Sequence, residues 1–102
     1  MLNPDILSGE LVAMLQRFEA TPEKTLIGCP NTKSLNWKLV VNFRHRLGIG
    51  IVSIWESAGC CDIDFLPEGS QDGIALHGEF DSDAPLLQFI TTSLASLLSN
   101  SI

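Results

Sequence analysis

Strict alternation of apolar and polar residues predicts β-structure in the middle of the chain. Residues 35–44 alternate over their whole length, and residues 61–65 alternate in the same way, with Asp62 and Asp64 on the polar side. Residues 49–55 are rich in β-branched side chains and are bounded by glycine. The apolar face of the first segment consists of Leu35, Trp37, Leu39, Val41 and Phe43. We therefore expect three strands, each with a buried face and a face toward water.

The second and third of these strands are expected to form a hairpin through the turn at residues 56–59. The orientation of the second strand stays open, because two sets of side chains compete for its inner face. These sets are Ile49, Ile51 and Trp55 on one side and Val52 and Ile54 on the other. Residues 74–80 alternate again, with His77 and Glu79 on the polar side, and predict a further strand. A short apolar segment at residues 24–28, followed by Pro30, fits an edge strand.

Amphipathic helices are expected at both ends of the chain. Asn3 can cap a helix that begins at Pro4, with Ser8 as an alternative cap, and we expect residues 21–22 (Thr-Pro) to end it. Its apolar stripe consists of Leu7, Leu11, Met14, Leu15 and Phe18. A second helix should begin after residues 81–83, where acidic residues precede a proline. Its stripe consists of Leu86, Leu87, Ile90, Leu94, Leu97 and Leu98.

These elements predict an α+β fold in a single globular domain spanning residues 1–102. Consecutive strands joined by short turns should pair antiparallel in a four- to five-stranded sheet. Because the strands are apolar mainly on one face, both terminal helices should pack on that face, giving a two-layer sandwich. The opposite face is then open to water, and it should carry Asp62, Asp64, His77 and Glu79.

The tryptophans, one histidine and two of the cysteines each receive an expected position. Trp37 should be a core residue, and His45, in the turn at residues 44–48, should be solvated. Trp55 is either core or a contact residue at the end of its strand, with the core favoured. Neighbours on a strand point to opposite faces, so Cys61 should be buried, with Cys60 outward or near the turn. An odd number of cysteines, three, argues against a disulfide framework.

The charge of the chain is acidic and unevenly distributed. The net charge is −6, yet all six basic residues precede residue 47, and eight acidic residues with no basic one follow it. A nucleic-acid partner is disfavoured, because a phosphate-binding surface must be basic; a basic protein partner is favoured instead. No apolar run has the roughly 20 residues that span a bilayer, and residues 1–5 do not resemble a signal peptide, so we expect a cytoplasmic protein without a membrane partner.

Candidate chemistry is limited to the polar side of the predicted sheet. No nucleophile elbow, phosphate-binding glycine loop or Ser–His–Asp grouping occurs, so we expect no enzyme activity, no catalytic residue and no cofactor. One alternative is a small metal- or ligand-binding domain that uses Asp62, Asp64, His77 and Glu79, since carboxylates and imidazole suit several divalent ions. Another alternative is an oligomer that pairs through an exposed sheet edge.

A family resemblance lies in the hairpin. The run from Val52 to Asp64, VSIWESAGCCDID, resembles the strand–turn–strand region of small bacterial immunity proteins of contact-dependent growth-inhibition and related polymorphic toxin systems (TriTu-like immunity proteins). The similarity extends over residues 33–98, and Ala58 is an extra residue in the turn. The resemblance implies an acidic cytoplasmic domain that binds one cognate toxin domain, often a basic nuclease, and blocks it.

The sequence therefore predicts a non-enzymatic immunity protein that binds a toxin domain through an acidic surface, as a monomer or weak dimer. Charge complementarity would speed the encounter, and a few central contacts would hold the complex. The expected contact residues are Trp55, Glu56, Asp62, Asp64, His77 and Glu79.

Overall fold

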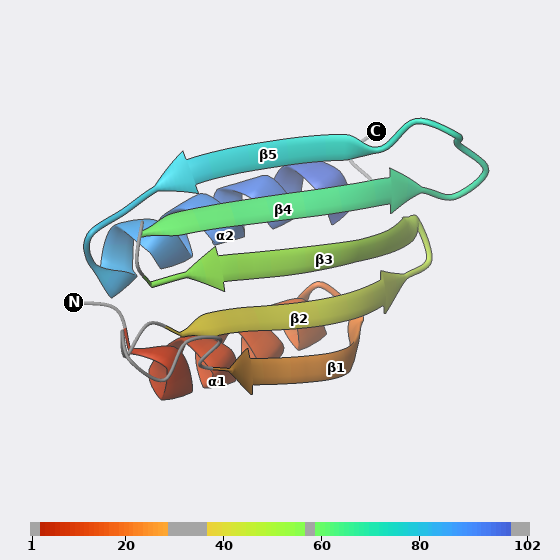
Figure 1. Ribbon diagram of the computed structural model, residues 1–102. Helices are drawn as coiled ribbons and strands as arrows, with labels where there is room; N and C mark the ends of the chain where they lie inside the picture. Colours follow the sequence, from red (N-terminus) through yellow and green to blue (C-terminus); the bar gives the residue numbers. More distant parts are fainter. Residues whose placement is uncertain (1–2, 29–36, 57–58, 99–102) are drawn as a thin grey trace.

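A computed structural model describes residues 3–28, 37–56 and 59–98 of the chain. Along the chain, one helix precedes the five strands and one helix follows them. The elements are α1 (Pro4–Arg17), β1 (Thr21–Gly28), β2 (Lys38–His45), β3 (Gly48–Trp55), β4 (Cys60–Pro67), β5 (Ile74–Glu79) and α2 (Asp83–Leu98). The strands form one antiparallel sheet in chain order, β1-β2-β3-β4-β5, so every connection joins neighbours (Figure 1).

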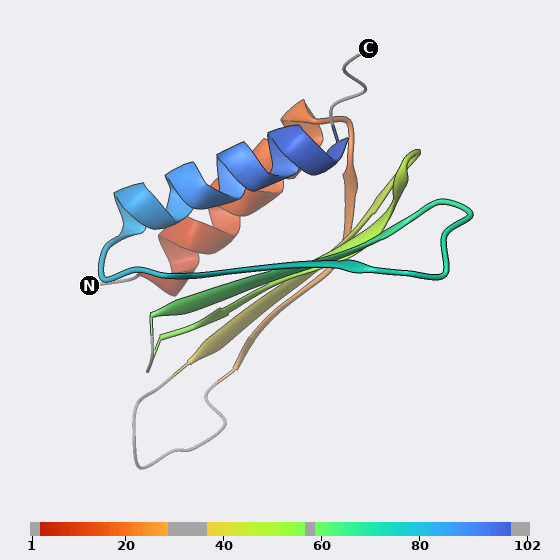
Figure 2. The same cartoon turned by 90° about the horizontal axis from the view of Figure 1, so that it is seen from above.

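Both helices pack on the same face of the sheet. Figure 2 shows α1 and α2 side by side on one side of the strands. Helix α1 contacts β1 and β2, whereas α2 contacts β4 and β5, and the helices also contact each other. The predicted two-layer α+β sandwich is confirmed.

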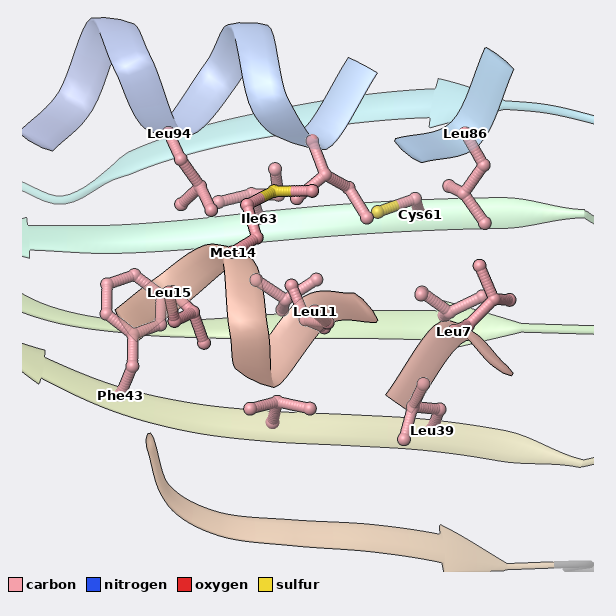
Figure 3. Packing of buried hydrophobic residues seen from close by; sticks show 14 of the residues in the cluster. Leu7, Leu11, Met14, Leu15, Leu39, Phe43, Cys61, Ile63, Leu86 and Leu94 are labelled. Atoms are coloured by element: carbon pink, nitrogen blue, oxygen red, sulfur yellow. The ribbon is translucent and has the colours of Figure 1, made fainter. Parts of the chain in front are cut away.

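The core lies between the helices and the inner face of the sheet. Side chains from both helices converge there on those of β2, β3 and β4 (Figure 3). The rings of Phe43 and Phe65 stack with their centroids 6.2 Å apart. They flank Gly50 in the register of the sheet, and a Cβ atom at Gly50 would lie 2.3 Å from the ring of Phe43. Glycine at this position is therefore what allows the two rings to meet.

Helix α1 begins as predicted and ends earlier than predicted. The Asn3 side chain accepts hydrogen bonds from the backbone N–H groups of Asp5 and Ile6, so Asn3 is the cap and Ser8 is not. The helix ends at Arg17, and Glu19 has a positive φ of 63°, which turns the chain back toward the sheet. The expectation that residues 21–22 end the helix is wrong, because they already belong to β1.

His45 is buried, and its predicted solvation is wrong. It is the last residue of β2 and lies on the same inner face as Phe43, with 7% of its surface exposed. Its Nε2 atom lies 3.0 Å from the carbonyl oxygen of Phe18, and its Nδ1 atom accepts the N–H of Leu47 at 3.0 Å. The imidazole thus ties the end of α1 to the β2–β3 turn.

The orientation of β3, which the sequence left open, is resolved by the structure. Val52 and Ile54 are fully buried, while Ile49 and Ile51 are exposed on the opposite face. Trp55 is half-buried on that opposite face, so the expectation that it is a core residue is wrong. Trp37 is buried as predicted.

Some predictions fall outside the described residues. These are Leu35, Pro30 and the Ser57–Ala58 part of the hairpin turn, together with the third cysteine, Cys29. Among the helices of the described ranges, neither has the length and hydropathy needed to cross a bilayer.

Candidate functional site

The face of the sheet that the helices leave uncovered, here called the open face, presents its side chains in four rows across the strands. The strand register gives the rows as Lys38, Trp55, Cys60 and Glu79; Val40, Ser53, Asp62 and His77; Asn42, Ile51, Asp64 and Ala75; and Arg44, Ile49 and Leu66. The first two rows lie at the β3–β4 turn, and the last two lie toward the β2–β3 turn. The open face therefore has a polar end and an apolar end.

The polar end contains a group of four side chains, Cys60, Asp62, His77 and Glu79, here called the polar cluster. Nδ1 of His77 lies 2.5 Å from Oδ1 of Asp62, directly across the β4–β5 pair. The Cys60 thiol lies 4.0 Å from Oε1 of Glu79, the residue that it opposes. One ligand-type atom from each of Cys60, His77 and Glu79 lies within 4.8 Å of the other two. The structure thus brings together three of the six expected contact residues.

The neighbouring carboxylates influence the pKa values of His77 and Cys60 in the polar cluster. The hydrogen bond that His77 donates to the Asp62 carboxylate raises the pKa of His77 above its ordinary value; desolvation opposes this shift, and the negative charges of Asp62 and Glu79 add to it. Desolvation, followed by the charges of Glu79 and Asp62, raises the pKa of the Cys60 thiol. On the inner face, burial is the main cause that raises the pKa of Cys61 to about 12. The two adjacent cysteines thus lie in different environments, as the alternation predicts.

Trp55 and Glu56 lie beside the polar cluster at the end of the hairpin. The Lys38 ammonium lies 4.6 Å from the centroid of the Trp55 ring, a cation–π contact on the open face. Glu56 is half-buried, and its backbone N–H donates to the carbonyl oxygen of Trp37. Gly59 completes the turn with a φ of 60°, and a Cβ atom there would lie 2.1 Å from the carbonyl oxygen of Phe80.

The apolar end of the open face contains a groove of about 550 Å³, here called the apolar groove. Its apolar lining includes Ile49, Ile51, Leu66 and Ile74, and Asp64 also lines it. Ile49 is 50% exposed and Ile51 is 40% exposed. At the far side, Arg44 forms an ion pair of 3.0 Å with Glu23. Asp64 therefore belongs to the groove and not to the polar cluster.

Charge on the open face follows the asymmetry of the sequence. The β4 and β5 side carries Asp62, Asp64 and Glu79, while β2 contributes Lys38 and Arg44. Lys38 lies over an indole and Arg44 pairs with a carboxylate, so neither cation neutralises the acidic side directly. The acidic half of this face is therefore confined to two strands.

Sequence reasoning missed Cys60 and the apolar groove. Cys60 could have been included from its two-residue spacing to Asp62, which places both side chains on one face of a strand. The isoleucines of the groove could not be assigned from β3 alone, because both of its faces carry apolar residues. Gly50 lies on the inner face against the ring of Phe43, so Ile49 and Ile51 point to the opposite face, and this tertiary contact is not visible in the sequence of β3.

Comparisons of this chain with protein-family models, with curated proteins and with solved structures found no match.

Proposed function

We propose that this protein is a non-enzymatic binding module that docks a basic protein domain on its open face. The observation that carries the proposal is the juxtaposition, on one uncovered sheet face, of an apolar groove and an acidic half. A protein interface of this kind combines apolar contacts at its centre with charged groups that orient the partner.

The apolar groove supplies the central contacts. Ile49 and Ile51 are large side chains that remain exposed although the same strand buries Val52 and Ile54 completely. Exposed apolar side chains that gather in a groove are typical of protein interaction sites. An apolar side chain of the partner placed in the groove, over Ile51 and Leu66, would remove the groove's lining from water and gain about 25 cal/mol for each Å² buried.

The acidic strands select a basic partner. Asp62, Asp64 and Glu79 lie on the β4 and β5 side, next to the groove, within the part of the chain that contains no basic residue. A positive partner surface would be attracted to this side and would approach faster at low ionic strength. Trp55, at the hairpin end, offers an aromatic contact beside the same acidic side.

The resemblance of residues 52–64 to immunity proteins favours a toxin domain as the partner. In this proposal the chain acts in the cytoplasm and blocks one cognate toxin by binding, with no catalytic step of its own. A gene for a large secreted toxin should then lie next to the gene for this chain.

Site-specific photo-crosslinking in the native cells tests the proposal. A photoreactive amino acid replaces Ile51 in the apolar groove, and in a matched control it replaces Ile6, which is 53% exposed on α1. We expect position 51, but not position 6, to form an adduct with a basic protein. The Asp62→Lys and Asp64→Lys double variant should abolish this adduct.

Capture alone does not establish immunity, so the captured domain is then produced in cells with and without this chain. Growth arrest that the wild-type chain relieves and the Asp62→Lys and Asp64→Lys variant does not relieve is the expected result. A harmless captured domain, or equal relief by both chains, would overturn the proposal.

A further inference from the structure

We propose that Cys60, His77 and Glu79 form a binding site for a zinc-like divalent transition-metal ion on the open face. The metal site does not rest on the protein partner proposed above, although both use Asp62 and Glu79. It also differs from the ligand set expected from the sequence, because Cys60 enters it, Asp64 does not, and Asp62 acts through His77.

The donor set selects the class of ion. A thiolate, an imidazole and a carboxylate are the three ligand types that Zn²⁺ uses in proteins, and thiolate excludes Mg²⁺ and Ca²⁺, which take oxygen ligands. Two of the three ligands are anionic when bound, so they neutralise the charge of a divalent cation. Three protein ligands leave a fourth position of a tetrahedral site for water.

The backbone already holds the ligands at the right positions. Cys60 and Glu79 are direct partners in the β4–β5 register, and His77 opposes Asp62 one row away, so all three side chains project from the same face of two paired strands. Their ligand-type atoms lie within 4.8 Å of one another. Zinc bond lengths and tetrahedral angles require separations of roughly 3.3–3.6 Å. The separations must therefore contract by up to about 1.5 Å on metal binding, through rotation of the Cys60 and Glu79 side chains about their χ angles, while Asp62 holds His77 in place.

Asp62 acts as a positioning residue for His77. Its Oδ1 atom lies 2.5 Å from Nδ1 of the imidazole, so Nε2 is the ring nitrogen that remains for a metal. A carboxylate that accepts the second N–H of a ligating histidine is a regular feature of zinc sites, where it fixes the tautomer and the orientation of the ring. This contact exists without a metal, so the imidazole is already oriented.

Titration with Co²⁺, followed by competition with Zn²⁺, tests the site in the full chain. The parent chain and all variants carry Cys29→Ser, so that Cys60 and Cys61 are the remaining thiols that could bind Co²⁺. We expect one Co²⁺ per chain and a thiolate-to-cobalt charge-transfer absorption band. Cys60→Ser should abolish this band although Cys61 remains, and His77→Gln and Glu79→Gln should each weaken binding by more than about 10-fold. Asp62→Asn should keep the band and weaken binding by about 10- to 100-fold.

Asp64→Asn is the matched control, because Asp64 lies on the same strand and face but outside the cluster. It should bind Co²⁺ with the affinity of the parent chain. These variants alter exposed or half-buried positions, and far-ultraviolet circular dichroism verifies that each remains folded. Absence of the charge-transfer band in the parent chain, or equal affinity in the Cys60→Ser and Asp64→Asn variants, would overturn the proposal.

Discussion

The two faces of the sheet are built from the same strands but differ in burial and composition. Strand β4 shows this most clearly, since Cys61, Ile63 and Phe65 are buried while Asp64 and Leu66 between and beside them are exposed. The inner face is covered by both helices and supplies the core, whereas the open face carries the polar cluster and the apolar groove. The difference teaches that folding requires only one face of this sheet, so the other face can be adapted to binding.

The largest expected difference between the faces concerns stability. Leu94 of α2 is fully buried in the core, so Leu94→Ala should lower the free energy of unfolding by about 2–5 kcal/mol through lost burial and a residual cavity. Asp62→Ala on the open face should change it by only about 0.5 kcal/mol. Urea denaturation measures both values, and the reverse ranking would contradict the two-layer architecture.

A smaller but sharper contrast involves the two histidines, which lie on opposite faces. His45→Leu removes the contacts to the Phe18 carbonyl and the Leu47 N–H, leaving these partly buried backbone groups without their imidazole partner. The expected cost is about 1–3 kcal/mol in the free energy of unfolding. His77→Leu, the matched change on the open face, should cost less than about 0.5 kcal/mol. Similar urea midpoints for the two variants would show that the burial of His45 does not stabilise the fold.

The smallest effect concerns the pH dependence of His77 in metal-free protein. Its folded-state pKa is raised above the ordinary value of 6.5 mainly by the hydrogen bond that it donates to the Asp62 carboxylate. The protonated imidazole therefore adds stability that is fully present below the unfolded pKa and is lost as the pH rises through the higher folded pKa. A titration followed by nuclear magnetic resonance in chelator should show a lower His77 pKa in Asp62→Asn than in Asp64→Asn. Equal values in the two variants would exclude the hydrogen bond as the cause.

Most of the fold follows from the periodicity of the sequence. Alternation located β2, β4 and β5, the spacing of leucines located α2, and short connections implied antiparallel neighbours. Sequence patterns gave wrong predictions where contacts between distant residues determine the structure. The end of α1 depends on the positive φ of Glu19, and the burial of His45 depends on a carbonyl group at position 18, which is remote in sequence.

The site was only partly predictable for a related reason. The open face, with Asp62, His77 and Glu79 together, follows from strand period alone. The pairing of Cys60 with Glu79 requires the exact β4–β5 register, which a loop of several residues does not reveal. Predicting the groove requires knowing which face of β3 points inward. That orientation depends on the packing of Gly50 against the rings of Phe43 and Phe65.

The affinity of an open-face variant for the captured partner domain tests the central claim most directly. Ile51→Thr, Asp62→Asn and Asp64→Asn are combined in one chain, and calorimetry compares its binding with that of the parent chain. The account predicts at least about a 100-fold loss of affinity, with a free energy of unfolding that changes by no more than about 1 kcal/mol. Parental affinity in this folded variant would contradict the assignment of the open face as the binding surface.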